Sequence, residues 1–154
     1  SVEQIHSLSF TRIRQEKLLR AGACYIFCQL DGKRLKIRYA GDASMIVVGN
    51  RGEMLYDGIR KSIADAPRGN NPGKVNSDVF YLKNKDRVVV ASDGLWENIL
   101  IEEALPIIRN FPIDVAIKKL SELAEKGMTA PMNNGAYGNK DNLSIVIYEM
   151  LPVI

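Results

Sequence analysis

Apolar and polar residues alternate between residues 23 and 56, which is the pattern of half-buried β-strands. Turn residues interrupt this alternation twice: Asp31-Gly32 is a strong hairpin signal, and residues 50–52 form a second break. The sequence therefore predicts an antiparallel meander of four strands, at residues 23–30, 35–40, 44–49 and 53–56.

Helical spacing of apolar residues replaces the alternation at the start of the chain and again in its second half. Residues 1–20 fit one amphipathic helix that ends near Gly22. Residues 112–126 give the clearest helix, and Gly127 is its expected end. Pro106 would disturb a helix over residues 102–109, so we expect a late start or a kink there.

Three more strands are predicted in the second half: a hairpin of residues 78–82 and 87–91, and a final strand at 143–150. The run 88–91 is apolar at every position, which predicts burial on both faces. The stretches 57–77 and 128–140 are expected to be loops, the first with a helical turn at 59–63. Runs of strands followed by runs of helices predict an α+β fold, with antiparallel β-sheets and flanking helices, in a single domain over residues 1–154.

The composition is that of an ordinary soluble globular protein, with 46% hydrophobic and 25% charged residues. The net charge of +3 is scattered along the chain, apart from a basic helix face at residues 12–20, so no nucleic-acid partner is expected. No apolar stretch is long enough to span a bilayer and no signal peptide begins the chain, so no membrane partner is expected.

Cys24 and Cys28 lie in a strand-rich segment at a spacing that places both on one face of a strand. Four residues of extended chain separate their Cα atoms by roughly 13 Å, which is too far for a disulfide. We therefore expect buried, reduced thiols and an intracellular protein, cytoplasmic or nuclear. The single histidine, His6, has no partner nearby in sequence, which argues against Ser-His-Asp or Cys-His catalysis.

Acidic residues stand where three predicted strands begin or end: Asp42 after the second strand, Asp93 after the buried run, and Asp141 before the final strand. Glu97 follows Asp93 at a spacing that places both on one side of a helical turn. Each of these motifs alone is an ordinary turn sequence. Carboxylates brought together from several strand ends repel one another, however, and a divalent cation relieves that repulsion. The combination predicts a metal site.

Specific motifs carry a family resemblance. The run 88–98, which contains Ser-Asp-Gly-Leu-Trp, resembles the most diagnostic motif of the PPM-type (type 2C) metal-dependent protein serine/threonine phosphatases. Residues 139–147, with Asp-Asn-Leu-Ser, resemble the family's closing motif, residues 40–44 its Gly-Asp-Ser segment, and residues 21–24 its Gly-Ser-Thr-Ala segment. The likeness runs from about residue 20 onward, in the family's order.

The resemblance implies part of the family's α-β-β-α sandwich and hydrolysis of phosphoserine and phosphothreonine in a phosphoprotein substrate. It also implies two Mn²⁺ or Mg²⁺ ions that activate a water molecule. Asp93 and Asp141 match the core metal ligands of the family. Asp42 matches the carboxylate of a third, more weakly held ion, and Glu97 falls at another position linked to that ion, where the family commonly has Asp.

This chain departs from the family pattern in two places, and the first of them changes the expectation for its activity. The family's first metal-binding segment, typically Asp-Gly-His-Gly-Gly, and the arginine before it are both missing. The arginine that follows Gly-Asp-Ser is also absent, since Ala43-Ser44-Met45 stands there, but this departure says little about metal binding. We expect weak or absent metal binding and no activity for this polypeptide alone, and sheet edges open to the missing N-terminal segment or to another chain.

Three functional interpretations remain open from the sequence. The first is a serine/threonine phosphatase whose remaining piece lies elsewhere, and the retained acids favour it. The second is a degenerate PPM-fold adaptor or regulatory binding module without catalysis, which the missing ligand segment favours. The third is an unrelated metal-binding or nucleotide-binding α+β domain.

Overall fold

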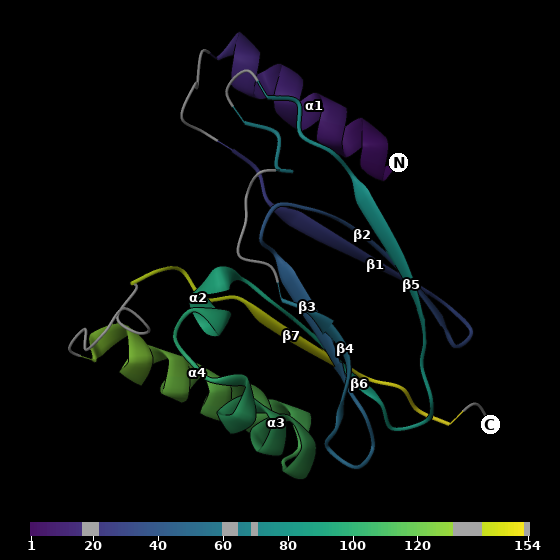
Figure 1. Ribbon diagram of the computed structural model, residues 1–154, viewed down its shortest axis with the longest axis vertical. Coiled ribbons are helices and arrows are strands. Elements are labelled where there is room, and N and C mark those ends of the chain that lie inside the picture. The colour runs from purple at the N-terminus through teal and green to yellow at the C-terminus, as the bar shows by residue number, and fades with distance from the viewer. Residues whose placement is uncertain (17–21, 60–64, 69–70, 131–139, 153–154) are drawn as a thin grey trace. The chain divides into compact units, whose positions relative to one another are not determined.

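The computed structural model of this 154-residue protein describes residues 1–16, 22–59, 65–68, 71–130 and 140–152. The chain forms two compact units, each with one antiparallel sheet (Figure 1). Unit 1 comprises Ser1–Ala43 and Arg60–Tyr81, and unit 2 comprises Ser44–Ile59 and Leu82–Ile154. Antiparallel sheets with flanking helices confirm the predicted α+β class.

Unit 1 holds a helix and a three-stranded sheet in the order β1-β2-β5; the elements are α1 (Val2–Gln15), β1 (Tyr25–Asp31), β2 (Arg34–Ala40) and β5 (Asn76–Tyr81). The helix starts with a capping box, in which Ser1 Oγ accepts a hydrogen bond of 3.3 Å from the backbone N–H of Gln4. The predicted first helix is confirmed, but it ends at Gln15, earlier than expected; residues 17–21 lie outside the described part.

The hairpin of β1 and β2 is confirmed. Asp31 pairs with Arg34, so the turn consists of two residues, and Gly32 there has a φ of +57°. This left-handed conformation suits glycine, because it has no Cβ to clash with the backbone. Along β2, Leu35 and Ile37 point to one face and are buried. The alternation read from the sequence therefore gives this sheet one apolar and one polar face.

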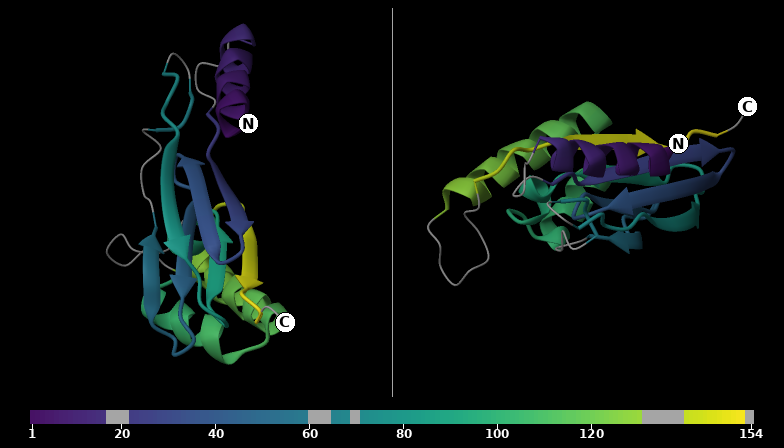
Figure 2. Two further views of the ribbon diagram at one scale, coloured as in Figure 1. Left: turned by 90° about the vertical axis from the view of Figure 1, so that its right-hand side faces the viewer. Right: turned by 90° about the horizontal axis from the view of Figure 1, so that it is seen from above.

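Unit 2 holds a four-stranded sheet in the order β4-β3-β6-β7 and three helices; the elements are β3 (Ser44–Val48), β4 (Met54–Gly58), β6 (Arg87–Ala91), β7 (Ile145–Glu149), α2 (Asp93–Trp96), α3 (Ile101–Asn110) and α4 (Ile113–Thr129). Ile46, Val89 and Ile147 stand side by side across the sheet and form a core with buried residues of α3 and α4. Figure 2 shows both helices along one face of this sheet. The predicted buried strand, final strand and long helix are confirmed.

Two predicted strand pairings are wrong. β5 and β6 do not form a hairpin, because β5 pairs with β2 whereas β6 pairs with β3 and β7. The predicted four-stranded meander is likewise two separate hairpins, β1–β2 in one sheet and β3–β4 in the other. Asp57-Gly58, expected in a loop, ends strand β4. Neighbouring strands along a chain usually pair, and the local pattern gives no sign of where the chain changes sheets.

Two predicted helix boundaries are also wrong. α3 begins at Ile101 and runs through Pro106, because Ala104 and Ile108 on either side of the proline are buried in the core and hold the helix there. Gly127 does not end α4, which continues to Thr129. A Cβ atom at Gly127 would lie 2.1 Å from the carbonyl oxygen of Asn98, so this glycine allows a close approach of backbones.

Cys24 and Cys28 form no disulfide, as predicted, but both are exposed, not buried. Cys28 lies on β1, an edge strand with a neighbour on one side only, and Cys24 precedes that strand. The edge position explains the exposure. Among the described residues, none of the helices has the length and apolar character needed to cross a membrane.

Candidate metal centre

Asp93 is held at the end of a buried strand. Strand β6 leads into Ser92, which has an extended conformation and stands at the N-cap position of the short helix α2 without a side-chain capping hydrogen bond. Asp93 is the first residue of that helix. Asp93 Oδ1 accepts a hydrogen bond of 2.9 Å from the backbone N–H of Gly94, and the residue is half-buried. The strand-to-helix turn thus fixes both the backbone and the carboxylate of Asp93.

Asp141 has the same arrangement before the final strand. Its Oδ1 accepts a hydrogen bond of 2.6 Å from the backbone N–H of Asn142, and the residue is exposed. Hydrogen bonds of this kind orient carboxylates that bind metal ions. Asp93 and Asp141 therefore share one local geometry, in which the amide of the following residue sets the direction of the side chain.

Three hydrogen bonds join the segments that carry these two acids. Beyond the last β6–β7 pair, the backbone N–H of Ser92 donates to the carbonyl oxygen of Ser144 at 3.0 Å. Ser92 Oγ accepts from the N–H of Ser144 at 3.1 Å and donates to the carbonyl oxygen of Asn142 at 3.1 Å. We call this set the Ser92 clamp. Asp93 and Asp141 are each one residue away from it, so the clamp brings them to the same end of two neighbouring strands.

Gly94 lets the two segments approach closely. A Cβ atom at this position would lie 2.4 Å from the carbonyl oxygen of Asn142, where no real Cβ fits. The steric role of Gly94 and the roles of Ser92 and Ser144 were not predicted from the sequence, in which Gly94 stood out only as part of a family motif. Ser-Asp-Gly directly after a buried strand was the signal available for this site.

Glu97 lies at the other end of α2. Its backbone N–H donates to the carbonyl oxygen of Asp93 at 2.9 Å, which confirms the predicted helical turn between the two acids, and its side chain is exposed. Asn98 Nδ2 donates to the carbonyl oxygen of Gly94 at 3.0 Å, and Asn98 is buried. α2 is therefore fixed at both ends, although it is only one turn long.

Asp42 belongs to unit 1, whereas the other three candidate residues belong to unit 2. It follows β2 and is half-buried. Gly41 before it has a φ of +83°, and a Cβ there would lie 2.5 Å from Cys24 Sγ. The turn that carries Asp42 thus depends on glycine, and a common site for Asp42 and Asp93 stays a prediction.

The donor set fits a hard divalent cation in type but supplies only part of a coordination shell. Carboxylate oxygens are the ligands that Mg²⁺ and Mn²⁺ prefer, and Mg²⁺ takes about six oxygen ligands in all, from protein, substrate and water. Within the described part of the chain, no three Asp, Glu, His or Cys side chains gather into a group that could hold a metal ion. Asp93 and Asp141 alone therefore do not make up a metal site, and their role as ligands stays a prediction.

Comparison with known proteins gives a clear result for the fold and none for the sequence. No protein-family model matches the chain, and no curated protein matches it in sequence. Among solved structures, the Mycobacterium tuberculosis serine/threonine phosphatase PstP/Ppp superposes with a TM-score of 0.74 at 18% identity. That match covers 96% of this chain and 68% of the phosphatase.

Two further solved structures show the same likeness. The catalytic domain of the serine/threonine phosphatase PstP in complex with two manganese ions matches with a TM-score of 0.73 at 20% identity, over 96% of this chain and 67% of that one. PppA, a regulatory component of the type VI secretion system in Pseudomonas aeruginosa, matches with a TM-score of 0.72 at 13% identity, over 94% and 64%. The chain thus spans about two thirds of the length of these structures, and the likeness shows a shared fold.

Proposed function

We propose that this chain, which has the fold of the PPM-type serine/threonine phosphatases, forms the larger part of a metal-dependent phosphatase domain that acts on phosphoserine and phosphothreonine in proteins. The Ser92 clamp carries this proposal, because it brings Asp93 and Asp141 to one end of paired strands. Each acid alone fits an ordinary turn, but the placement of both at one end of paired strands supports a shared metal site.

Asp93 and Asp141 would contribute carboxylate oxygens to a centre for two Mn²⁺ or Mg²⁺ ions, with Asp42 and Glu97 toward a third, weaker ion. The structure of PstP with two manganese ions supports this choice of metal. When bound, such ions activate a water molecule and neutralise the charge of the phosphoryl group. The residues of this chain hold their carboxylates in place, and the clamp keeps the separation of the two strands fixed.

The proposal includes a further polypeptide segment, on the same chain or another, that supplies the remaining metal ligands and contacts the substrate phosphate. Two observations support it: the partial donor set described above, and the greater length of the similar structures. A phosphoprotein is the proposed substrate. Cys24 and Cys28 form no disulfide, which supports an intracellular location, cytoplasmic or nuclear.

The test measures Mn²⁺-dependent phosphate release from a phosphothreonine peptide, using the full natural polypeptide. Asp93→Asn and Asp141→Asn should each reduce kcat by about a hundredfold or more, because each removes a ligand charge. Asp31→Asn is the matched control, since Asp31 also precedes a glycine but ends strand β1 beside a hairpin turn. Near-normal rates in both site variants, with the wild type active, would overturn the site assignment.

A second candidate is a PPM-fold adaptor without catalysis. The lack of a group of three potential ligands in the described part of the chain favours it. The same assay separates the two functions: an adaptor releases no phosphate as wild type, and its Asp93→Asn variant binds its partner as the wild type does.

A further inference from the structure

Asn98 is a buried polar residue at the end of the turn that carries Asp93 and Glu97. It is 2% exposed, and its side-chain Nδ2 donates a hydrogen bond of 3.0 Å to the carbonyl oxygen of Gly94. Its backbone N–H donates to the carbonyl oxygen of Leu95 at 3.1 Å. In an α-helix, the carbonyl of one residue accepts a hydrogen bond from the backbone N–H four residues later. The side-chain amide of Asn98 thus takes the place of this backbone donor at Gly94.

Gly94 orients the carboxylate of Asp93, because its backbone N–H donates to Asp93 Oδ1 at 2.9 Å. This position requires glycine, since a Cβ there would lie 2.4 Å from the carbonyl oxygen of Asn142. Glycine has more backbone freedom than any other residue, so by itself it is a poor anchor for a carboxylate. The hydrogen bond from Asn98 restrains this glycine at its carbonyl group. A series of hydrogen bonds therefore runs from Asn98 through Gly94 to Asp93.

The last turn of α4 holds Asn98 in place. A Cβ atom at Gly127 would lie 2.1 Å from the carbonyl oxygen of Asn98 and 3.0 Å from its Cβ, so the backbone of α4 packs directly on this residue. Met128, the next residue of α4, lies beside Gly94: its methyl group would be 3.5 Å from a Cβ there. Both ends of the hydrogen bond between Asn98 and Gly94 are therefore supported by the same turn of α4.

Two roles fit a buried asparagine at this position. It can only stabilise the fold, as other core side chains do, or it can also keep the carboxylate of Asp93 in one direction. The hydrogen-bond acceptor favours the second role, because Asn98 binds Gly94, the residue whose N–H meets that carboxylate. Asn98 also directly follows Glu97, so the same bond restrains the backbone at the second candidate acid of the turn.

We propose that Asn98 is a positioning residue of the metal centre: it holds Gly94 so that the amide of this glycine keeps the carboxylate of Asp93 in the direction in which it binds a divalent cation. The inference rests on the proposed function, since it needs a metal ion at Asp93. Removal of a residue that orients a metal ligand through hydrogen bonds typically weakens metal binding by about 10–100-fold. Loss of the Asn98 amide should therefore weaken metal binding and leave the binding of a phosphopeptide almost unchanged.

Asn98→Ala and Asn98→Ser form a matched pair that differs by one hydroxyl group. A serine hydroxyl in a helical turn can donate to the carbonyl oxygen four residues earlier. Ser121 Oγ does so in this protein, with a hydrogen bond of 2.9 Å to the carbonyl oxygen of Ile117. Both variants lose the volume of the asparagine amide, but only Asn98→Ser can restore a hydrogen bond to Gly94. The pair therefore separates the hydrogen bond from the packing.

The activity test records phosphate release from a phosphothreonine peptide by the full natural polypeptide over a range of Mn²⁺ concentrations. Asn98→Ala should raise the Mn²⁺ concentration for half-maximal rate by about tenfold and change the KM of the peptide by less than about twofold. Asn98→Ser should return the Mn²⁺ requirement to within about threefold of the wild type.

The control for a general loss of stability is Ile108→Val. It removes a methyl group from the core, where Ile108 is 0% exposed, and it removes no hydrogen bond of α2. Its Mn²⁺ requirement should equal that of the wild type. Equal requirements of Asn98→Ala and Asn98→Ser, or an increase as large in Ile108→Val, would mean that Asn98 only stabilises the fold and would overturn the inference.

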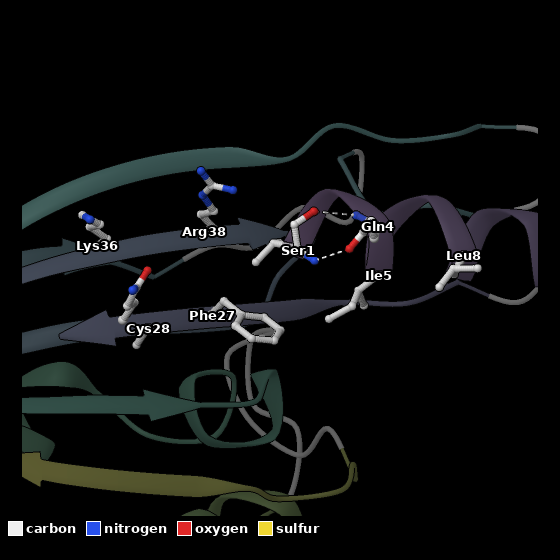
Figure 3. A pocket seen from close by; sticks show the side chains of 10 residues that line it. Ser1, Gln4, Ile5, Leu8, Phe27, Cys28, Lys36 and Arg38 are labelled. Atoms are coloured by element: carbon white, nitrogen blue, oxygen red, sulfur yellow. Dashed lines mark hydrogen bonds between the residues drawn. The ribbon is translucent and has the colours of Figure 1, made fainter. Parts of the chain in front are cut away.

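A second measurement needs no activity. With ¹⁵N-labelled glycine, asparagine and phenylalanine, the NMR signals of the Gly94 amide and the Asn98 side-chain amide are followed as Mg²⁺ is added to the wild-type polypeptide. Both should shift with the same half-saturation, because Asn98 is joined to Asp93 through Gly94. The Phe27 amide is the control. Phe27 lines a groove of unit 1 whose described lining contains Lys36 and Arg38 and no acidic residue (Figure 3), so no divalent cation is expected to bind there.

The outcomes of this titration separate the inference from the proposed function. If the Gly94 signal shifts and the Asn98 signal does not, Asp93 binds the metal ion without help from Asn98, and only the inference is wrong. If neither signal shifts at millimolar Mg²⁺, or Phe27 shifts as much as Gly94 does, there is no specific metal site at Asp93; the proposed function then fails, and the inference fails with it. The titration uses the wild type, so it decides the question even if Asn98→Ala does not fold.

Discussion

Ser92 and Asn142 are fifty residues apart in the sequence and are joined by a hydrogen bond of 3.1 Å from the hydroxyl of Ser92 to the carbonyl oxygen of Asn142. The same hydroxyl accepts a hydrogen bond from the N–H of Ser144. One small side chain thus connects the loop before β7 to the end of β6. The positions of Asp93 and Asp141 relative to each other depend on this serine.

Ser92→Ala removes both hydrogen bonds of the hydroxyl. We expect a loss of about 1 kcal/mol in the free energy of unfolding, because the partners are near the surface and water can replace the serine in part. Urea unfolding checks this value, and hydrogen exchange at the amide of Ser144 should become faster. Ser121→Ala is the control, since Ser121 Oγ bonds only to the Ile117 carbonyl oxygen within α4. An equally large loss of unfolding free energy in Ser121→Ala would mean that the Ser92 clamp stabilises the protein no more than a hydrogen bond within a helix does.

Gly127→Ala should destabilise the protein, although alanine normally favours a helix interior over glycine by about 1 kcal/mol. The new Cβ would lie 2.1 Å from the carbonyl oxygen of Asn98. Relief of this clash needs a shift of backbone, so we expect a net loss of about 1–3 kcal/mol in thermal or urea unfolding. Glu125→Ala, at an exposed position of the same helix, should change stability by less than about 0.5 kcal/mol. If Gly127→Ala stabilises the protein, α4 can shift away from the carbonyl oxygen of Asn98 at little cost, and the expected clash is wrong.

Arg87→Met should cost about 3 kcal/mol. Arg87 is 8% exposed, and its Nε donates to Glu149 Oε2 at 2.6 Å. The guanidinium also donates to the carbonyl oxygens of Ile108 and Phe111, so it joins β6 to β7 and to the end of α3. Its removal leaves a partly buried carboxylate and two carbonyls without their donor.

The matched control for Arg87 is Arg12→Met. Arg12 forms an exposed ion pair with Glu16 one helical turn away, and such pairs contribute less than about 0.5 kcal/mol. Urea unfolding of the two variants should therefore differ by more than about 2 kcal/mol. A similar loss of unfolding free energy in both variants would mean that the Arg87 interactions contribute no more than an exposed ion pair does.

Partial burial raises the pKa of the Cys28 thiol above its usual value, even though the residue as a whole is exposed. The folded state therefore favours the protonated thiol. The stability that this contributes is fully present below the pKa of the unfolded chain and is lost as the pH rises through the folded-state pKa. In a Cys24→Ser background, the rate of alkylation by iodoacetamide should reach half its maximum at a higher pH when folded than in urea. A midpoint at the same or lower pH would contradict the burial.

Mn²⁺ should bind the 154-residue chain with a dissociation constant no tighter than about 1 mM, because Asp93 and Asp141 supply only part of a coordination shell. Isothermal titration measures this constant directly. Asp93→Asn should abolish the small heat of Mn²⁺ binding that the wild type shows in this titration, and Asp31→Asn should leave it unchanged. Micromolar affinity in the wild type would show that the described acids, together with residues outside the described part, form a complete site.

The sequence by itself determined the local elements and the candidate acids. Alternation gave the strands, Asp31-Gly32 gave the first hairpin, and apolar spacing gave α4, because these features depend on side chains within a few residues of each other. The position of Asp93 at the end of a buried strand and the start of a helical turn was also predictable from its neighbours.

Only the tertiary structure decided which sheet each strand joins and which backbones touch. β5 and β6 are separated by one short turn, yet they pair with different partners far away in the chain. The pattern of the sequence predicts a helix end at Gly127, but the role of this glycine comes from Asn98 in the turn after α2. The pairing of strands and the close approach of two backbones depend on residues that are dozens of positions apart. A short stretch of sequence therefore does not determine the free energy of packing them together.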